Sequence, residues 1–161
     1  MQKISAGLLM YKIDNKTLKV FLVHPGGPFW KNKDKGAWSI PKGECENSEK
    51  LLDCAKREFY EETGIKPLES NENYIDLGSI KQKNRKTVHA FAFEGDFKGE
   101  INCSSFINIE FPPKSKNYIK IPEVDKGEFF NFKDAEEKIN PSQFELLERL
   151  KNFLKFDNNK K

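Results

Sequence analysis

"REFYEETG", residues 57–64, gathers one arginine and three glutamates in its first six positions. Glu58 lies three positions before Glu61 and four before Glu62, so on a helix the three carboxylates share one side. Like charges at this spacing destabilise a bare helix by about 0.2–0.5 kcal/mol per pair. The residues alone leave two explanations open: a solvated acidic face, or a site that holds a hard divalent cation through carboxylate oxygens.

A helix is predicted around this stretch, over about residues 48–63. Its apolar side recurs every four residues, at Leu51, Ala55 and Phe59. Asn47 or Ser48 can cap its first turn with a side-chain oxygen. Gly64 stands where a helix ends in a left-handed residue, and Ile65 can close that cap with an apolar contact.

The rest of the chain is predicted to be strands joined by turns, with a closing helix. Apolar runs and alternation predict strands over residues 4–13, 18–25, 38–40, 74–82, 87–95, 101–111 and 127–132. The strand at 87–95 carries apolar residues on both faces, which indicates an interior strand. Residues 112–126 are predicted as a loop. Asn140, Pro141 and Gln143 fit the cap, the first-turn proline and the reciprocal cap partner of the closing helix.

Composition excludes some classes of function. The chain has 161 residues, of which 33% are charged, and a formal net charge of +3. Its lysines are interleaved with acidic residues, so there is no strong nucleic-acid signal, only a mild preference for anionic ligands. No eighteen apolar residues run together, so no membrane span is predicted. Cys45, Cys54 and Cys103 form no C-x-x-C pattern, and they predict reduced thiols in a cytoplasmic protein.

The flanks of the acidic helix choose between the two explanations. The run "GECENSEKLLDCAKREFYEETGI", residues 43–65, has a glycine, five residues, Glu49, seven residues and then the charged stretch. This pattern resembles the Nudix box at every specified position, and "WSIPKGE" before it and the closing helix also fit that family. The resemblance implies an α/β fold, an α/β/α sandwich around a mixed β-sheet, with one domain over residues 1–156 and a polar tail over 157–161. It also implies hydrolysis of a nucleoside diphosphate linked to a further group, with Mg²⁺ or Mn²⁺.

The resemblance gives each acidic residue of the box an expected role. Glu58, Glu61 and Glu62 are the expected metal ligands, and Glu58 or Glu61 is the expected general base. Arg57 and Glu49 are expected to form an ion pair that supports the ligand helix.

Two further sets of residues follow from the resemblance outside the helix. A further glutamate, as a ligand or base, is expected from a later loop, where Glu123 is favoured over Glu94 and Glu128. Gly43 is expected to let the backbone turn from strand to loop. Lys42 and Trp38 are the expected substrate-binding residues.

The substrate is expected to be a small nucleotide, either a nucleoside triphosphate or a dinucleoside polyphosphate. "PKG" at residues 41–43, with Trp38 upstream, resembles dinucleoside polyphosphate hydrolases and some inositol pyrophosphate hydrolases. Phe29 and Trp30 could stack a base or form a lid of the core. Two rivals stay open: a non-catalytic nucleotide-binding sensor, and a hydrolase of RNA ends, which would need a basic channel. The sequence leaves the oligomeric state open.

Overall fold

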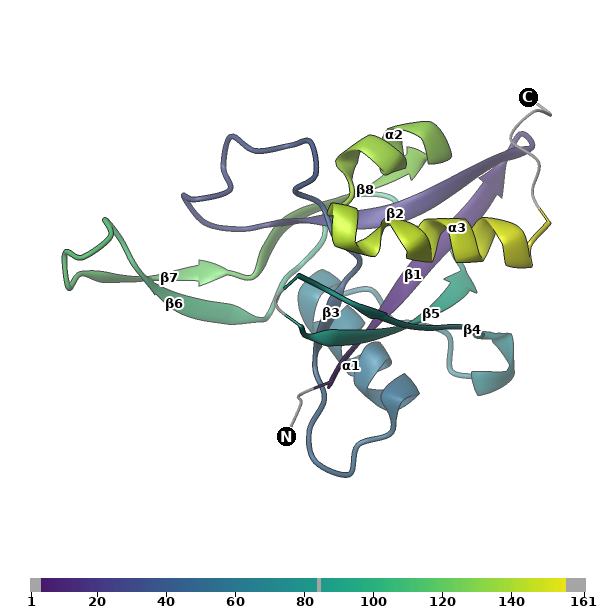
Figure 1. Cartoon of the computed structure of the whole chain (residues 1–161), viewed down its shortest axis with the longest axis horizontal. Coiled ribbons are helices and arrows are strands. Elements are labelled where there is room, and N and C mark those ends of the chain that lie inside the picture. The colour runs from purple at the N-terminus through teal and green to yellow at the C-terminus, as the bar shows by residue number, and fades with distance from the viewer. Residues whose placement is uncertain (1–3, 84, 156–161) are drawn as a thin grey trace.

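A mixed six-stranded sheet forms the centre of the protein in a computed structural model that describes residues 4–83 and 85–155 (Figure 1). The strands are β1 (Ile4–Asp14), β2 (Thr17–Pro25), β3 (Lys42–Glu44), β4 (Ile75–Lys81), β5 (Thr87–Glu94) and β8 (Val124–Asn131). They lie in the order β4-β5-β1-β2-β8, with β3 paired to β1. The β1–β5 pair is parallel and the other pairs are antiparallel. The prediction of an interior strand is confirmed, because β5 lies between β4 and β1.

Helices cover both faces of this sheet. One face packs on α1 (Leu51–Thr63), and the other packs on α2 (Phe132–Lys138) and α3 (Phe144–Phe153). Alternation along β1 divides its side chains between the two cores: Leu8 and Met10 face α1, whereas Leu9 and Tyr11 face α2 and α3. The predicted α/β/α sandwich around a mixed sheet is confirmed.

The helix that carries the acidic stretch begins later than predicted. It starts at Leu51, and Lys50 precedes it without a side-chain cap. Ser48 is instead in a left-handed turn with φ 69°, and the backbone N–H of Glu46 donates to Glu49 Oε1 at 3.0 Å. The loop thus uses the Glu49 carboxylate, and capping by Asn47 or Ser48 was a wrong prediction. The end was predicted correctly, since Gly64 has φ 74° and donates its N–H to Tyr60 O.

A two-stranded hairpin projects from the body, and its second strand falls where a loop was predicted, whereas its first strand lies inside the predicted strand 101–111 (Figure 1). It consists of β6 (Phe106–Glu110) and β7 (Tyr118–Pro122). Most of its side chains are exposed, so the burial pattern that marks a strand in sequence is weak here. The loop over residues 26–36 lies against it, because the rings of Phe29 and Phe111 meet edge to face at 5.6 Å.

The C-terminal third also differs from the prediction in two places. The short helix α2 was not predicted, although Asn131 caps it by accepting the N–H of Asp134 at 2.8 Å. Asn140 does cap the next turn, the short 3₁₀ helix Pro141–Gln143, through the N–H of Ser142. Gln143 is no cap partner, because it is fully buried and accepts the N–H of Ile40 at 3.0 Å.

The cysteines correct a further prediction. Cys45 and Cys54 form a disulfide, with their Cα atoms 5.3 Å apart, whereas Cys103 is free. The prediction of reduced thiols is therefore wrong for the first two. Residues 38–40 make only isolated bridges in place of the predicted strand. The predicted polar tail at 157–161 lies outside the described residues. Within the described residues, no helix is long and apolar enough to cross a membrane.

Candidate functional site

Two adjoining clefts lie beside the acidic helix. The larger, about 430 Å³, is lined by Ser5, Lys42, Gly43, Glu44, Glu58, Glu61, Lys86, Ser105 and Glu123. The smaller, about 230 Å³, is lined by Val23, Pro25, Trp30, Ala37, Ser39, Ile40, Lys42, Glu62, Gln82, Glu123, Val124, Asn140 and Gln143. Lys42 and Glu123 line both, so the two clefts meet at these residues. The structure thus brings four predicted carboxylates and the predicted lysine to one place.

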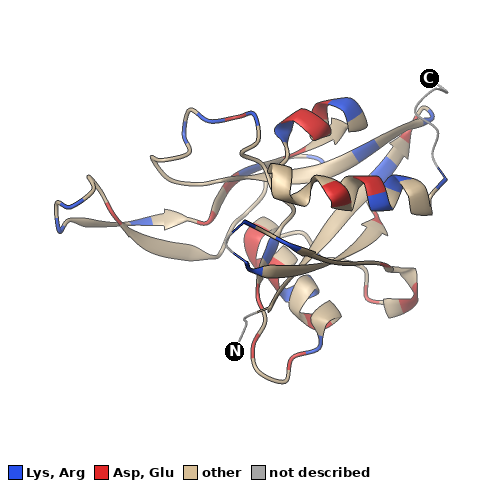
Figure 2. Ribbon diagram, in the orientation of Figure 1, with Lys and Arg blue, Asp and Glu red and all other residues tan. Residues whose placement is uncertain are grey.

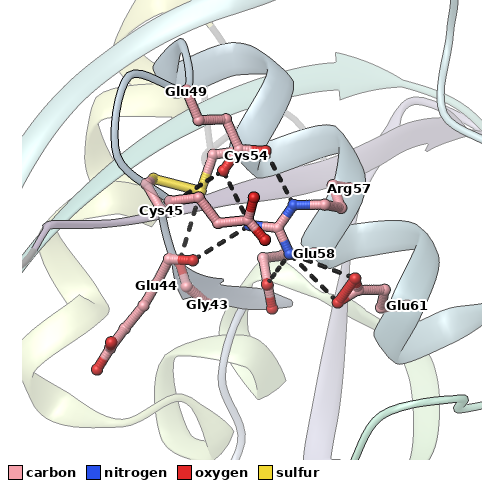
Figure 3. The surroundings of a disulfide bond; sticks show 9 residues. Gly43, Glu44, Cys45, Glu49, Cys54, Arg57, Glu58 and Glu61 are labelled. Atoms are coloured by element: carbon pink, nitrogen blue, oxygen red, sulfur yellow. Dashed lines mark hydrogen bonds and ion pairs between the residues drawn. A yellow bond between two sulfur atoms is a disulfide. The ribbon is translucent and has the colours of Figure 1, made fainter.

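Arg57 holds the acidic side chains together from within the helix (Figure 3). Its Nε donates to Glu49 Oε2 at 2.8 Å and its Nη2 donates to Glu49 Oε1 at 2.9 Å, a bidentate pair. Its Nη1 donates to Glu58 Oε2 at 2.6 Å and to the carboxylate of Glu61 at 3.3 Å. The Glu44 carbonyl accepts from Nη2 at 3.2 Å. One guanidinium therefore connects the loop before α1 to two carboxylates on α1.

Gly43 is a place of close approach in β3, paired with Ala6 of β1. A Cβ atom on Gly43 would lie 1.8 Å from Glu58 Oε1. Only glycine leaves room for the Glu58 carboxylate against the strand. The expected turn from strand to loop is therefore wrong, because the residue continues the strand.

Burial acts on the charges at the clefts. It raises the pKa of Glu58, although the hydrogen bond from Arg57 opposes this rise. It raises the pKa of Glu62 well above its ordinary value, and the neighbouring Glu123 and Glu58 charges add to that effect. It lowers the pKa of Lys42, against the attraction of Glu62. By contrast, the hydrogen bonds from Arg57 lower the pKa of Glu49 to about 2. Negative charges thus lie close together at the clefts, whereas the charge of Glu49 is paired with that of Arg57.

Glu123 is the later glutamate that reaches the clefts. Its side chain accepts a hydrogen bond from Ser105 Oγ at 2.6 Å, and its backbone carbonyl accepts the N–H of Gly26 at 3.0 Å. The two alternative glutamates, Glu94 and Glu128, do not line the clefts. Glu94 lines a separate hollow with Lys12, and Glu128 is exposed on β8.

Trp38 was expected to contact substrate, and its position rules this out. Its side chain is 2% exposed, and its ring packs edge to face against those of His24 and Phe130. Its Nε1 donates to Asp34 Oδ1 at 2.8 Å. Trp30 is the tryptophan that lines a cleft, and 41% of it is exposed. Trp30 is therefore open to a ligand and is no lid of the core.

The clefts are also lined by polar residues that were not predicted as site residues, among them Ser39, Gln82, Ser105 and Gln143. Gln143 Nε2 donates to Ser39 Oγ at 3.1 Å and to Gln82 Oε1 at 3.2 Å. Ser105 holds Glu123 in place. Their positions in the sequence carry no pattern, because β2, β4, the hairpin and the turn before α3 meet here only in the folded chain.

The donor set fits a hard divalent cation. Glu58, Glu61, Glu62 and Glu123 offer only oxygen atoms, which Mg²⁺ prefers. A cation would also offset the charges of Glu123 and Glu58, which add to the effect of burial in raising the pKa of Glu62. Among the described residues, no three of these carboxylates come within 4.8 Å of one another. Glu58 is instead turned to Arg57, so its side chain would exchange that partner for a cation.

Comparisons with known proteins agree with this fold. The NUDIX domain profile matches residues 1–150. A search of curated protein sequences finds no match. The fold is similar to that of a C. elegans Ap4A hydrolase in a binary complex, with a TM-score of 0.64 and 19% identity over 94% of this chain and 98% of that one. It is also similar to the NUDIX domain of Shewanella oneidensis NrtR complexed with ADP ribose, with a TM-score of 0.67 and 14% identity over 96% and 89%.

Proposed function

The chain belongs to the NUDIX domain family as a Nudix-type phosphoanhydride hydrolase, and we propose that it is a pyrophosphohydrolase that uses Mg²⁺ or Mn²⁺ to cleave a nucleoside triphosphate or a dinucleoside polyphosphate. One observation carries this proposal: Glu58, Glu61 and Glu123 lie at one cleft with Lys42. The carboxylates can bind a divalent cation, and the Lys42 ammonium can bind a phosphate. A nucleotide that binds together with a divalent cation would use both kinds of group.

We assign the binding of the cation to Glu58, Glu61, Glu62 and Glu123. When bound, such a cation lowers the pKa of a water and offsets the negative charge on two phosphates. This assignment is supported by the clefts, which are lined by all four side chains.

Glu58 or Glu61 takes the proton from the water that attacks phosphorus in line. Burial raises the pKa of Glu58, which improves it as a base near neutral pH. Glu61 is freer, with 37% of its side chain exposed and only 3.3 Å contacts to Arg57. Arg57 and Glu49 touch neither water nor phosphate in this scheme, and they position the helix carboxylates.

Lys42 binds the phosphate chain beyond the two phosphates at the carboxylates. It lines both clefts, so its ammonium can reach a phosphate in either. Trp30 and the buried Gln143 line the smaller cleft, where a ring and an amide suit a nucleobase.

The proposal is tested by a substrate screen with Mg²⁺, using nucleoside triphosphates, dinucleoside polyphosphates, nucleotide sugars and capped RNA. Products are identified by chromatography. We expect cleavage of a phosphoanhydride bond that stops when the divalent cation is chelated. Cleavage that persists without divalent cations, or no cleavage of any substrate by the folded protein, would overturn the proposal.

A second candidate function is hydrolysis at the 5′ end of an RNA, and the lysines around the clefts favour it. Six lysines stand on two neighbouring segments, three in the loop 26–36 and three on residues 114–120 of the hairpin region (Figure 2). Beside them Trp30 is 41% and Tyr118 68% exposed, and such rings can stack bases. This gathering was not apparent in the sequence, where the same lysines are scattered.

The two candidate functions can be distinguished by how the rate of cleavage depends on salt concentration. A capped or 5′-triphosphorylated RNA should be cleaved faster than a free nucleotide at low salt, and the advantage should fall steeply as salt rises. An RNA that reacts no faster than a nucleoside triphosphate at low salt would remove the second candidate and leave the first untouched.

A further inference from the structure

We propose that Cys45 and Cys54 are a reversible thiol–disulfide site that controls how tightly the acidic helix face binds its divalent cation. The inference rests on the proposed function, because it takes Glu58 and Glu61 as cation ligands. Cys45 follows β3 directly and Cys54 lies in the first turn of α1, with Cα atoms 5.3 Å apart. Their bond closes the loop that contains Glu49.

The disulfide lies close to Glu49, the residue that holds Arg57 beside the carboxylates of α1 (Figure 3). A carboxylate oxygen of Glu49 lies within 4.8 Å of both sulfur atoms. Glu49 holds Arg57 through two hydrogen bonds, and the Glu44 carbonyl beside Cys45 accepts a third. The bond therefore fixes both loop groups that orient the guanidinium.

The Arg57 guanidinium also donates hydrogen bonds to Glu58 and Glu61, so restricting the guanidinium also restricts these two expected metal ligands. Arg57 Nη1 donates to Glu58 at 2.6 Å and to Glu61 at 3.3 Å. The disulfide thus closes the loop that carries Glu49, and hydrogen bonds connect Glu49 through Arg57 to two carboxylates of the larger cleft. Partners of this supporting kind typically change metal affinity by about tenfold to a hundredfold when they are removed. Loosening the loop that carries them should have a smaller effect, of about threefold to tenfold.

The two sulfur atoms differ in access. Cys54 is fully buried against the sheet, whereas Cys45 is half-buried on a loop whose residues Glu46, Asn47 and Ser48 are exposed. An incoming thiol therefore reacts at Cys45. The reaction is exchange with a small disulfide, which is the oxidant, or with a small thiol, which is the reductant.

The exchange balances in two steps. In the oxidising direction, the Cys45 thiolate attacks a small disulfide and releases one small thiol, which leaves a mixed disulfide on Cys45. The Cys54 thiolate then attacks the Cys45 sulfur and releases the second small thiol. Two protein thiols and one small disulfide thus become one protein disulfide and two small thiols. The reducing direction reverses both steps.

Reduction should loosen the loop and weaken the site. A disulfide that closes a loop of this length restricts the unfolded chain, and its loss should lower Tm by about 5–10 °C. We expect the Kd for Mg²⁺ to rise about threefold to tenfold at the same time, because Glu49 no longer holds Arg57 in one place.

The test compares the full chain after equilibration with oxidised or reduced glutathione. Maleimide alkylation in denaturant followed by mass spectrometry counts the free thiols, including the buried Cys54. Calorimetry gives the Kd for Mg²⁺, and a thermal melt gives Tm. Wild type should show one reactive thiol when oxidised and three when reduced, with the shifts given above. Cys103→Ser is the matched control and should keep both shifts. Cys45→Ser should lose both and behave as the reduced protein in either buffer.

The variant Glu49→Gln distinguishes an effect of the disulfide on cation affinity from an effect on stability alone. This variant should still form the disulfide and keep the Tm shift, but its Kd for Mg²⁺ should be the same in both redox states. The proposal is overturned if oxidised wild type keeps three reactive thiols. It is also overturned if the disulfide forms and the Kd for Mg²⁺ does not change. These readouts need no turnover, so a failure of the proposed hydrolysis would be recognised separately, in the substrate screen.

Discussion

Replacing Gly43 by alanine is expected to disable the acidic face while the fold stays intact. The new Cβ would lie 1.8 Å from Oε1 and 2.1 Å from Cδ of Glu58, far inside van der Waals contact. Only the end of a flexible side chain stands in the way, so Glu58 should swing out while β3 keeps its pairing with β1.

The magnitude follows from what Glu58 loses. It gives up the 2.6 Å hydrogen bond from Arg57, and a charge-assisted bond of this kind contributes about 1.5–3 kcal/mol. If the Glu58 carboxylate instead stayed at the site, its side chain would have to leave its preferred rotamer, which would cost about 0.5–1.5 kcal/mol. The lost hydrogen bond alone, at about 1.5–3 kcal/mol, corresponds to a loss of about 10-fold to 150-fold in kcat/KM. The displaced carboxylate is solvated, so Tm should fall by only about 2–6 °C.

The assay measures kcat/KM with the substrate from the screen, the Kd for Mg²⁺ and Tm. In the double variant Gly43→Ala/Glu58→Ala, the alanine at 43 should add nothing to the loss caused by Glu58→Ala alone. Gly95→Ala is the matched control, because its Cβ would meet only Met10 and Phe93 side-chain atoms at 3.1 Å, and it should stay within about twofold of wild type. A folded Gly43→Ala protein with wild-type kcat/KM would refute the reasoning.

Three further predictions use the same assay. Glu61→Gln should lower kcat by at least about 100-fold with Tm unchanged, whereas Asp53→Asn on the same helix should have no effect; equal activities would remove the metal-site assignment. Arg57→Ala should weaken Mg²⁺ binding about tenfold or more and also lower Tm, and a loss of activity with both quantities unaltered would instead place Arg57 against substrate. Lys42→Ala should reduce cleavage of a dinucleoside tetraphosphate about tenfold to 100-fold, and a nucleotide sugar less, relative to the exposed-lysine control Lys66→Ala; equal losses on the two substrates would make Lys42 a general electrostatic contact.

The acidic helix shows how much a local pattern can determine. Glu58, Glu61 and Glu62 share a side because helical geometry alone fixes residues three and four apart. The end of the helix at Gly64 was predicted correctly for the same reason, since a left-handed residue is a local requirement. The start was not, because Glu49 bonds to the loop backbone and the chain turns before Leu51.

Exposure explains the elements that were missed. The first hairpin strand, β6, lies inside the predicted strand 101–111, but β7 was predicted as part of a loop. Most side chains of β7, Tyr118 among them, are exposed, so no alternation between a buried and a solvated face marks it in the sequence. The helix α2 is short and packs through Phe132 and Ala135, too few positions to show a helical period.

From the sequence alone, the acidic helix and the carboxylates that lie on it could be predicted, because both follow from spacing along one element, whereas the fold class was implied by the resemblance of residues 43–65 to the Nudix box. The sequence favoured Glu123 as the later glutamate, and the tertiary structure gives the reason that it lines the clefts: Ser105 holds it there, whereas Glu128 is exposed on β8. The tertiary structure also buried Trp38 in the core and joined Cys45 to Cys54. These outcomes depend on which strands pair and which helix covers them, and spacing in the sequence does not fix distances between residues on different elements.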